Sequence, residues 1–416
     1  MSVTAPLGFR AAGVAAGLKA AGARDVAVVL NDGPSRAAAG VFTANRVQAA
    51  PVLWTRQVIR GGRVSAVVLN SGGANACTGP PGFADTHETA ERLAAQLSGS
   101  AGEIAVCSTG LIGERLPMDR LLPGVDAAVA EASRSGGLAA ADAIRTTDTV
   151  VKIAFRRGGT PSGGSGTPSG GSGTVSGGSG TVSGGSSTVS GGSYTIGGMA
   201  KGAAMLAPSL ATMLCVLTTD ADLSADDLDV ALRGAAAVTF DRLDTDGCMS
   251  TNDTVLLLAS GASGVQPDPA EFAGQLAAVC ADLARQLQLD AEGAGKSIAI
   301  EVVGAASERD AVSVGRAVAR SGLLKCAIAG EDPNWGRVLS AVGTTDAVFE
   351  PDQLNVAING IWICRSGYAA DDRSKVDLRP REVTITIDLA AGPDSATIAT
   401  TDLTVAYVHE NTAYST

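Results

Sequence analysis

The chain has 416 residues, of which 45% are hydrophobic, 18% charged and only 3% aromatic, and its formal net charge is −11. This composition allows a large α/β fold with an aliphatic core, whereas the acidic balance argues against nucleic acid as a partner, because nucleic-acid-binding surfaces need clustered basic residues. The chain contains no uncharged apolar run of about 18 residues, which argues against a membrane span, and its first residues lack the basic-then-apolar order of a signal peptide.

The first part of the chain alternates short Val- and Ile-rich runs with turns, a pattern typical of strands. We expect strands at 25–32, 39–47, 52–59, 64–73, 103–110 and 149–159. Residues 85–97 space their apolar side chains at intervals of three and four, which predicts a helix, and a further helix is expected at 124–145.

Residues 160–194 consist of five tandem seven-residue repeats, from TPSGGSG to TVSGGSY. Gly and Ser dominate these repeats and no apolar seam exists, so the segment is predicted to be a disordered linker without a function of its own. A β-like run lies on either side, and we therefore interpret the repeats as an expanded hairpin loop. Because loop-closure entropy grows only logarithmically with length, the fold should tolerate this insertion.

After the repeats, predicted strands and helices are interleaved. The strands are expected at 214–223, 254–260, 297–306, 355–360, 382–390 and 395–403. The helices are expected at 225–243, 269–293 and 308–324. Because short turns join some of the strands, the predicted fold class is α/β with mixed β-sheets layered with helices, in place of one all-parallel sheet.

The motifs of several other enzyme classes are incomplete in this chain. The sequence GAGKS at 293–297 is similar to the end of a phosphate-binding loop, but Asp290 stands where that loop needs its first glycine. His87 and His409 are the only histidines and the seven cysteines form no CxxC pair, so the pattern of a zinc site is absent. We therefore expect no metal, no cofactor, and reduced thiols in a cytoplasmic protein.

The stretch KGAAMLAPSLATML, residues 201–214, combines apolar residues with a single lysine and a single threonine. A nucleophile without a histidine can use the α-amine of its own chain as the base, because an α-amino pKa of roughly 7.7–8.0 is close to neutral. Thr212 fits this chemistry if the bond after the small Ala211 breaks through an N-to-O acyl shift and hydrolysis. Taken alone, these residues favour the simpler interpretation, in which Thr212 is an ordinary strand residue.

The same stretch closely resembles the signature KGxxMxxPxxATML of the ornithine acetyltransferase family, also called the glutamate N-acetyltransferases. Further matches follow in the family's order: GFRAAGVAAGLK, NSGGANACTG, CSTGLIG, RTTDT, STNDT, DAEGAGK, DPNWGR and the terminal ENTAYST. The resemblance implies an αββα-like sandwich that cleaves itself between Ala211 and Thr212. It implies an α chain of residues 1–211 and a β chain of residues 212–416, which stay associated as an α2β2 assembly.

The reaction that the resemblance implies is ping-pong acetyl transfer in arginine biosynthesis. Thr212 takes the acetyl group from N-acetylornithine, ornithine leaves, and glutamate accepts the acetyl group. This exchange needs no cofactor, and no motif decides whether acetyl-CoA is a second acetyl donor. Two alternatives stay open: a self-cleaving aminopeptidase or amidase, for which water is the acceptor, and an uncleaved relative that acts as a binding or scaffold protein.

The resemblance also assigns roles to individual residues. Thr109 and Gly110 match the family's oxyanion-hole pair, which would stabilise a developing negative charge on oxygen. The residues matched to substrate binding are Thr146, Lys201, Thr212, Glu292, Asn411 and Thr416. Lys201 would hold a carboxylate and Glu292 would hold an ammonium group. Thr147 is an alternative to Thr146. The matches at Asn411 and Thr416 imply that the C-terminal tail folds back into the site.

The sequence departs from the family's pattern at three positions. Gly73 stands where many members carry Asn, and Cys248 and Met249 stand where many carry Asp and Thr. None of the three is expected to touch a residue with an assigned role. The match DPNWGR, which contains Trp335, is expected to support folding or an interface and not catalysis.

Overall fold

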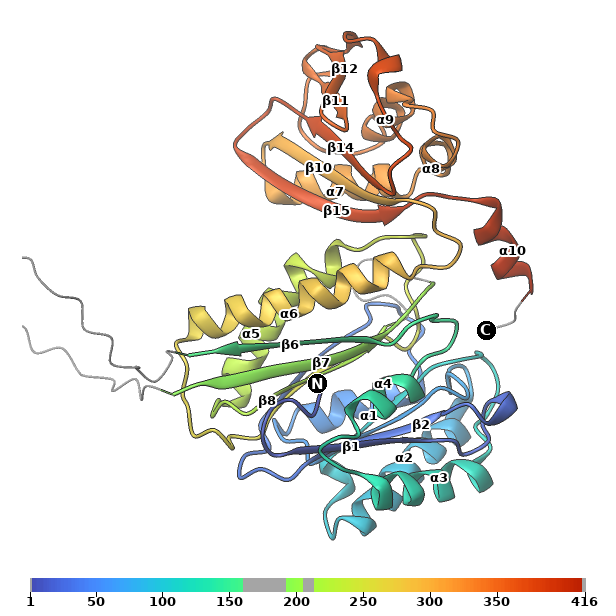
Figure 1. Ribbon diagram of the computed structural model, residues 1–416, viewed down its shortest axis with the longest axis vertical. Coiled ribbons are helices and arrows are strands. Elements are labelled where there is room, and N and C mark those ends of the chain that lie inside the picture. The colour runs from blue at the N-terminus through green and yellow to red at the C-terminus, as the bar shows by residue number, and fades with distance from the viewer. Residues whose placement is uncertain (1, 160–191, 205–212, 414–416) are drawn as a thin grey trace, which may run out of the picture.

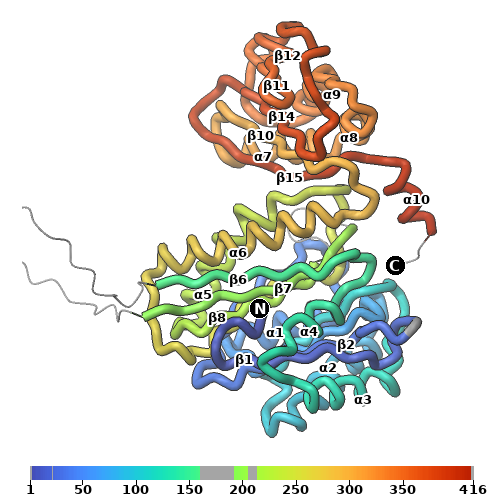
Figure 2. Tube along the Cα trace, in the orientation of Figure 1, coloured from blue at the N-terminus to red at the C-terminus, as the bar shows by residue number. Residues whose placement is uncertain are grey.

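A computed structural model describes residues 2–159, 192–204 and 213–413. Three predicted features therefore lie outside the described residues: the repeats from 160 to 191, the cleavage site at Ala211 and Thr212, and Thr416. The described chain passes through a larger layered unit and then through a smaller unit that contains most of the C-terminal part (Figure 1 and Figure 2).

Two mixed sheets lie face to face in the larger unit. The first sheet has the strand order β1 (Phe9–Val14), β2 (Val26–Asn31), β4 (Ala66–Asn70) and β5 (Ile104–Ser108). The second has the order β3 (Ala38–Phe42), β9 (Thr254–Ala259), β8 (Leu214–Thr219), β7 (Tyr194–Lys201) and β6 (Lys152–Gly158). Strands β4 and β5 pair in parallel, as do β8 and β9, whereas the other neighbouring strands of these two sheets are antiparallel. The prediction of mixed sheets is confirmed.

Apolar side chains fill both the space between the two sheets and the space under the helices outside them. Phe9 and Leu69 of the first sheet meet Val216 and Leu256 of the second in one buried cluster. The outer face of the first sheet is covered by α2 (Gly79–Gln96) and α3 (Met118–Glu131). The outer face of the second is covered by α5 (Ala225–Val238) and α6 (Pro269–Leu289). The layer order of helix, sheet, sheet and helix is the αββα-like sandwich expected from the sequence (Figure 1).

The hairpin predicted around the repeats is present. Strands β6 and β7 are antiparallel, and their register runs from Lys152 opposite Ala200 to Gly158 opposite Tyr194. The expected end of the insert at residue 194 is wrong, because Tyr194 is fully buried as the first residue of β7. Its hydroxyl donates a hydrogen bond of 2.8 Å to Glu271, which satisfies the polar end of a buried aromatic ring.

A separate α/β unit with its own core follows α6. Its sheet has the order β13 (Tyr368–Ala369), β12 (Ile361–Arg365), β11 (Asn355–Ile358), β14 (Glu382–Asp388), β10 (Ser297–Ala305) and β15 (Asp394–Thr401). Three helices pack against this sheet: α7 (Glu308–Ala319), α8 (Gly322–Ala329) and α9 (Trp335–Val342). Trp335 packs against the core of this unit, which agrees with a folding role for DPNWGR. The last described helix is α10 (Val405–Ala413).

Two sequence-based element assignments near the N-terminus are wrong. Residues 52–59 form most of helix α1 (Ala50–Ile59) and not a strand, because Pro51 occupies its first turn and Val52, Thr55 and Val58 face inward at intervals of three. The helix expected at 124–145 is two helices, α3 and α4 (Gly137–Ala143).

The break between α3 and α4 has a tertiary cause. Ser133 forms a β-bridge with Ala11 of β1, and a Cβ atom at Gly136 would lie 1.8 Å from the carbonyl oxygen of Ala11. The chain therefore leaves the helix to pair with β1, at a place where only glycine fits. The helix expected at 308–324 is also divided, since α7 ends at Ala319 and Ser321 caps the N-terminus of α8.

All seven cysteines are unpaired thiols. Four of them are buried, in agreement with core-filling roles: Cys107, Cys215, Cys280 and Cys364. No helix in the described part of the chain is both long and apolar enough to cross a membrane.

Candidate active site

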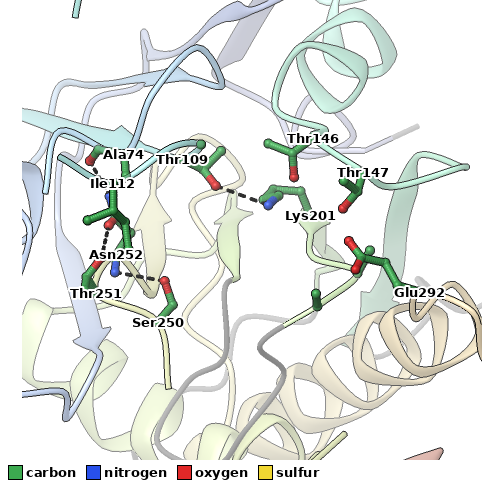
Figure 3. Close-up of a pocket in the computed structure, with 13 residues that line it drawn as sticks. Ala74, Thr109, Ile112, Thr146, Thr147, Lys201, Ser250, Thr251, Asn252 and Glu292 are labelled. Carbon is green, nitrogen blue, oxygen red and sulfur yellow. Dashed lines mark hydrogen bonds between the residues drawn. The ribbon is translucent and has the colours of Figure 1, made fainter. Parts of the chain in front are cut away.

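A pocket of about 520 Å³, part of it open to solvent, lies where the ends of the two sheets meet (Figure 3). Its described lining residues are Ala74, Thr109, Gly110, Ile112, Thr146, Thr147, Lys201, Ala203, Ala204, Ser250, Thr251, Asn252 and Glu292. Five residues that the sequence analysis selected are therefore brought together from four separate segments. Thr109 and Gly110 follow β5, and Thr146 follows α4. Lys201 ends β7, and Glu292 follows α6.

Glycine is required at position 110. Its φ angle is +132°, and a Cβ atom there would lie 2.9 Å from both the Cα and the nitrogen of Gly73. Gly73 also forms an isolated β-bridge with Thr109. The expectation that Gly73 lies away from the assigned residues is therefore wrong, since it contacts both members of the predicted oxyanion-hole pair.

Lys201 is a buried cation at the centre of the pocket. Its side chain is almost completely buried, and Nζ donates a hydrogen bond of 3.2 Å to Oγ1 of Thr109 (Figure 3). Burial lowers the pKa of Lys201, whereas the negative charges of Asp148, Asp253 and Glu292 oppose this shift. A buried cation that lines a pocket open to solvent is suited to binding a carboxylate.

Asp253 directly follows the pocket residue Asn252 and was not selected from the sequence. It is fully buried, and its Oδ1 atom accepts a hydrogen bond of 2.8 Å from the amide nitrogen of Met213. Among the described residues its Oδ2 atom has no hydrogen-bond partner. Burial raises the pKa of the Asp253 carboxyl group well above its ordinary value. Asp253 therefore anchors the main chain at the residue directly after Thr212.

Three polar residues that precede β9 in the sequence also line the pocket, although none was assigned a role: Ser250, Thr251 and Asn252. Among them, the side-chain amide of Asn252 donates hydrogen bonds of 2.6 Å to the carbonyl of Ala74 and 2.8 Å to that of Ser108. It thereby ties the loop after β4 to the end of β5. The available signal was the match STNDT, which places polar residues directly before a fully buried strand.

The structure also describes Thr146, its alternative Thr147, and Asn411. Thr146 and Thr147 both line the pocket. The structure does not bring Asn411 to the pocket: it is exposed on α10, and its side chain donates a hydrogen bond of 3.0 Å to the carbonyl of Tyr407. The start of α10 is close to the site, since Thr404 donates a hydrogen bond of 2.6 Å to the carbonyl of Gly293.

The residues on either side of the predicted cleavage site meet at the pocket. Strands β7 and β8 are antiparallel, and Lys201 lies opposite Leu214 in their register. The connection between these two strands contains Ala211 and Thr212. Because Lys201 lines the pocket and Met213 is anchored by Asp253, both ends of that connection are fixed beside it.

The described residues of the pocket contain one cation, one carboxylate and several hydroxyl groups. Opposite charges at two points suit a ligand that carries both a carboxylate and an ammonium group. No group of three or more potential metal ligands occurs in the part of the chain that the structure describes.

Comparisons with known proteins match residues 10–184 and 181–416 to the ArgJ family. The arginine biosynthesis bifunctional protein ArgJ of Thermobifida fusca is 67% identical over 417 residues, which cover 100% of each chain. Its namesake from Mycobacterium tuberculosis (strain CDC 1551 / Oshkosh) is 54% identical over 421 residues, which cover 99% of this chain and 96% of the relative. The crystal structure of ornithine acetyltransferase complexed with ornithine, from Mycobacterium tuberculosis, is 52% identical and covers 50% of this chain and 94% of that chain, with a TM-score of 0.39.

The family match begins at residue 10 and continues to residue 416, and the identity to the Thermobifida fusca protein extends over the whole of both chains. The resemblance that the sequence motifs indicate is therefore confirmed. The chain is an enzyme, an acyltransferase of arginine biosynthesis, and it belongs to the ArgJ family.

Proposed function

We propose that this enzyme transfers the acetyl group of N-acetylornithine to glutamate through an acetyl ester on Thr212. The observation that carries the proposal is the pocket, which combines Lys201, Glu292 and the Thr109–Gly110 pair beside the connection that contains Thr212. N-Acetylornithine carries an α-carboxylate and a side-chain ammonium, which match the two charged residues. The solved relative with ornithine bound is consistent with this substrate class.

The nucleophile is generated by self-cleavage. The hydroxyl of Thr212 attacks the carbonyl carbon of Ala211, the hydroxyl proton is transferred to the departing nitrogen, and water then hydrolyses the ester. The products are an α chain of residues 1–211 and a β chain of residues 212–416, which form an α2β2 assembly. The freed α-amine of Thr212 is then the base for acetyl transfer, because its pKa is near neutral.

The remaining residues bind the substrate and stabilise the negative charge that develops on its carbonyl oxygen. Thr109 and Gly110 form the oxyanion hole for both half-reactions. Lys201 holds the substrate carboxylate and Glu292 holds the side-chain ammonium of ornithine. Thr146 is a further contact to the substrate. Asn411 and Thr416 join it only when the C-terminal tail folds back into the site, because Asn411 on α10 does not line the pocket.

The reaction needs no cofactor, because one amide is exchanged for another of similar energy. The relatives are named bifunctional. We propose acetyl-CoA as a second acetyl donor for glutamate. We place this chemistry in the cytoplasm.

The proposal is tested by incubating the enzyme with N-acetylornithine, with and without glutamate, and measuring ornithine and N-acetylglutamate. Equal amounts of both products over many turnovers with glutamate, and no more than one ornithine per active site without it, support transfer. Ornithine released at the same rate without glutamate, and without N-acetylglutamate, identifies an aminopeptidase or amidase instead. A parallel reaction with acetyl-CoA and glutamate tests the second donor, and Thr212→Ala is the inactive control.

A further inference from the structure

A buried network of three charged residues lies behind the pocket and outside its lining. The ammonium of Lys152 is 2.6 Å from Oδ1 of Asp148 and 2.5 Å from Oδ2 of Asp290. The side chains of Lys152 and Asp148 are 0% exposed and that of Asp290 is 7% exposed. Burying charges costs free energy that pairing offsets only in part, so stability alone does not explain such a network.

Asp148 holds two segments that line the pocket. Its Oδ2 atom accepts a hydrogen bond of 3.1 Å from the amide nitrogen of Thr146. Its Oδ1 atom accepts one of 2.7 Å from the amide nitrogen of Gly202, the residue directly after Lys201. Burial by itself would raise the pKa of Asp148, but the cations Lys201 and Lys152 and the amide of Gly202 hold it below its ordinary value. Asp148 is therefore an ionised anchor for both segments.

Asp290 holds the third segment. It caps the C-terminus of α6 two residues before Glu292, and its carboxylate accepts a hydrogen bond of 3.0 Å from the amide nitrogen of Thr149. Lys152 joins Asp290 to Asp148. The segments that carry Lys201 and Glu292 are thus connected through this ammonium group, in addition to the hydrogen bond of 2.9 Å that the amide nitrogen of Glu292 donates to the carbonyl of Ala203.

We propose that the Asp148–Lys152–Asp290 network fixes the separation of Lys201 and Glu292 and thereby selects the length of the diamino-acid substrate. This inference rests on the proposed function, in which these two pocket residues hold the carboxylate and the ammonium at opposite ends of the substrate. One methylene group more or less is discriminated by roughly 10–200-fold in binding sites that fit their substrate well. The members of the network are positioning residues, since they act through the pocket residues and do not line the pocket themselves.

The test compares kcat/KM for N-acetylornithine with kcat/KM for N-acetyllysine, which is longer by one methylene, with glutamate as the acceptor. Three variants are measured: Asp290→Asn, Lys152→Met, and the neutral triple variant Asp148→Asn/Lys152→Met/Asp290→Asn. Asp290→Asn removes one carboxylate charge, and Lys152→Met leaves two buried carboxylates without their partner. The triple variant removes all three charges together. The ratio of the two kcat/KM values does not depend on the fraction of folded enzyme, so a purely structural role would leave it unchanged.

The matched control is Arg233→Met, because Arg233 pairs with Asp229 at 2.7 Å on the exposed surface of α5, with 61% of its side chain accessible. We expect the preference for N-acetylornithine to fall at least about threefold in the folded variants of the network, and to be unchanged in the control. A preference that changes less than about threefold in every folded variant overturns the inference alone. If the unaltered enzyme releases no ornithine from N-acetylornithine, the proposed function fails and the inference fails with it.

Discussion

Asp253 accepts a hydrogen bond of 2.8 Å from the amide nitrogen of Met213, so a fully buried carboxyl group anchors the main chain directly after the proposed nucleophile. Burial raises its pKa well above the ordinary value, although the amide of Met213 and the charge of Lys201 oppose the shift. A carboxyl group whose pKa is raised by folding stabilises the fold below its unfolded pKa. That contribution is lost as the pH rises through the raised pKa.

The first prediction concerns Asp253→Asn, which keeps the shape of the side chain and an acceptor for Met213. The melting temperature of the unaltered enzyme should fall as the pH rises through the raised pKa of Asp253, and this fall should be smaller in the variant. A series of melting curves at one scan rate and several pH values measures the difference. Parallel pH profiles for the two proteins would show that Asp253 is not the group responsible.

The second prediction concerns Lys201→Met. Removing a buried charged partner typically costs about 2–5 kcal/mol, so kcat/KM should fall by a corresponding factor for N-acetylornithine and for glutamate. The fold should persist, because the methionine side chain fills the same buried space and Asp148 keeps its ion pair with Lys152. Steady-state kinetics on the purified variant measure the loss. A variant that retains kcat/KM within about tenfold would exclude Lys201 as the carboxylate anchor.

The third prediction uses two glycines with φ > 0. Gly110→Ala should lower kcat by roughly 10²–10³-fold, because the added methyl group would collide with Gly73 and displace the oxyanion-hole pair. Gly264 has a φ of +66° and no atom within 4 Å of a Cβ placed there, so Gly264→Ala introduces backbone strain without a collision. Equal activity of the two variants, measured as acetyl transfer, would refute the role of Gly110.

The fourth prediction concerns the repeats between β6 and β7. Deleting residues 160–187 keeps a connection between the paired ends Gly158 and Tyr194, so self-cleavage and acetyl transfer should be unaffected. The shorter loop should raise the free energy of unfolding by about 1–2 kcal/mol, because closing a shorter flexible loop costs less entropy. Chemical denaturation and the exchange assay measure both effects. A large loss of either cleavage or transfer would show that the repeats have a function.

The strands buried on both faces could be predicted from the sequence, because β8 and β9 are nearly continuous apolar runs. Helix α1 could not, because a run of eight residues, 52–59, is too short for periodicity to separate strand from helix. The division between α3 and α4 depends on the contact of Ser133 and Gly136 with Ala11, which no local pattern reveals.

The site divides in the same way. Thr109, Lys201 and Glu292 could be selected because they stand in motifs, and the structure places all three at one pocket. Asp253 and Asn252 were missed because their importance comes from burial and from hydrogen bonds to residues far away in the sequence. The network of Lys152 could not be predicted either, since its partners come together only when β6 and the end of α6 pack side by side.

The central claim is that Thr212 becomes a chain N-terminus and carries the acetyl group. The most direct test is mass spectrometry of the purified enzyme after brief incubation with N-acetylornithine in the absence of glutamate. We predict a fragment of residues 212–416 that is heavier by one acetyl group on Thr212, and loss of that group when glutamate is added. A single uncleaved chain of 416 residues, or an acetyl group on any other residue, would contradict the account.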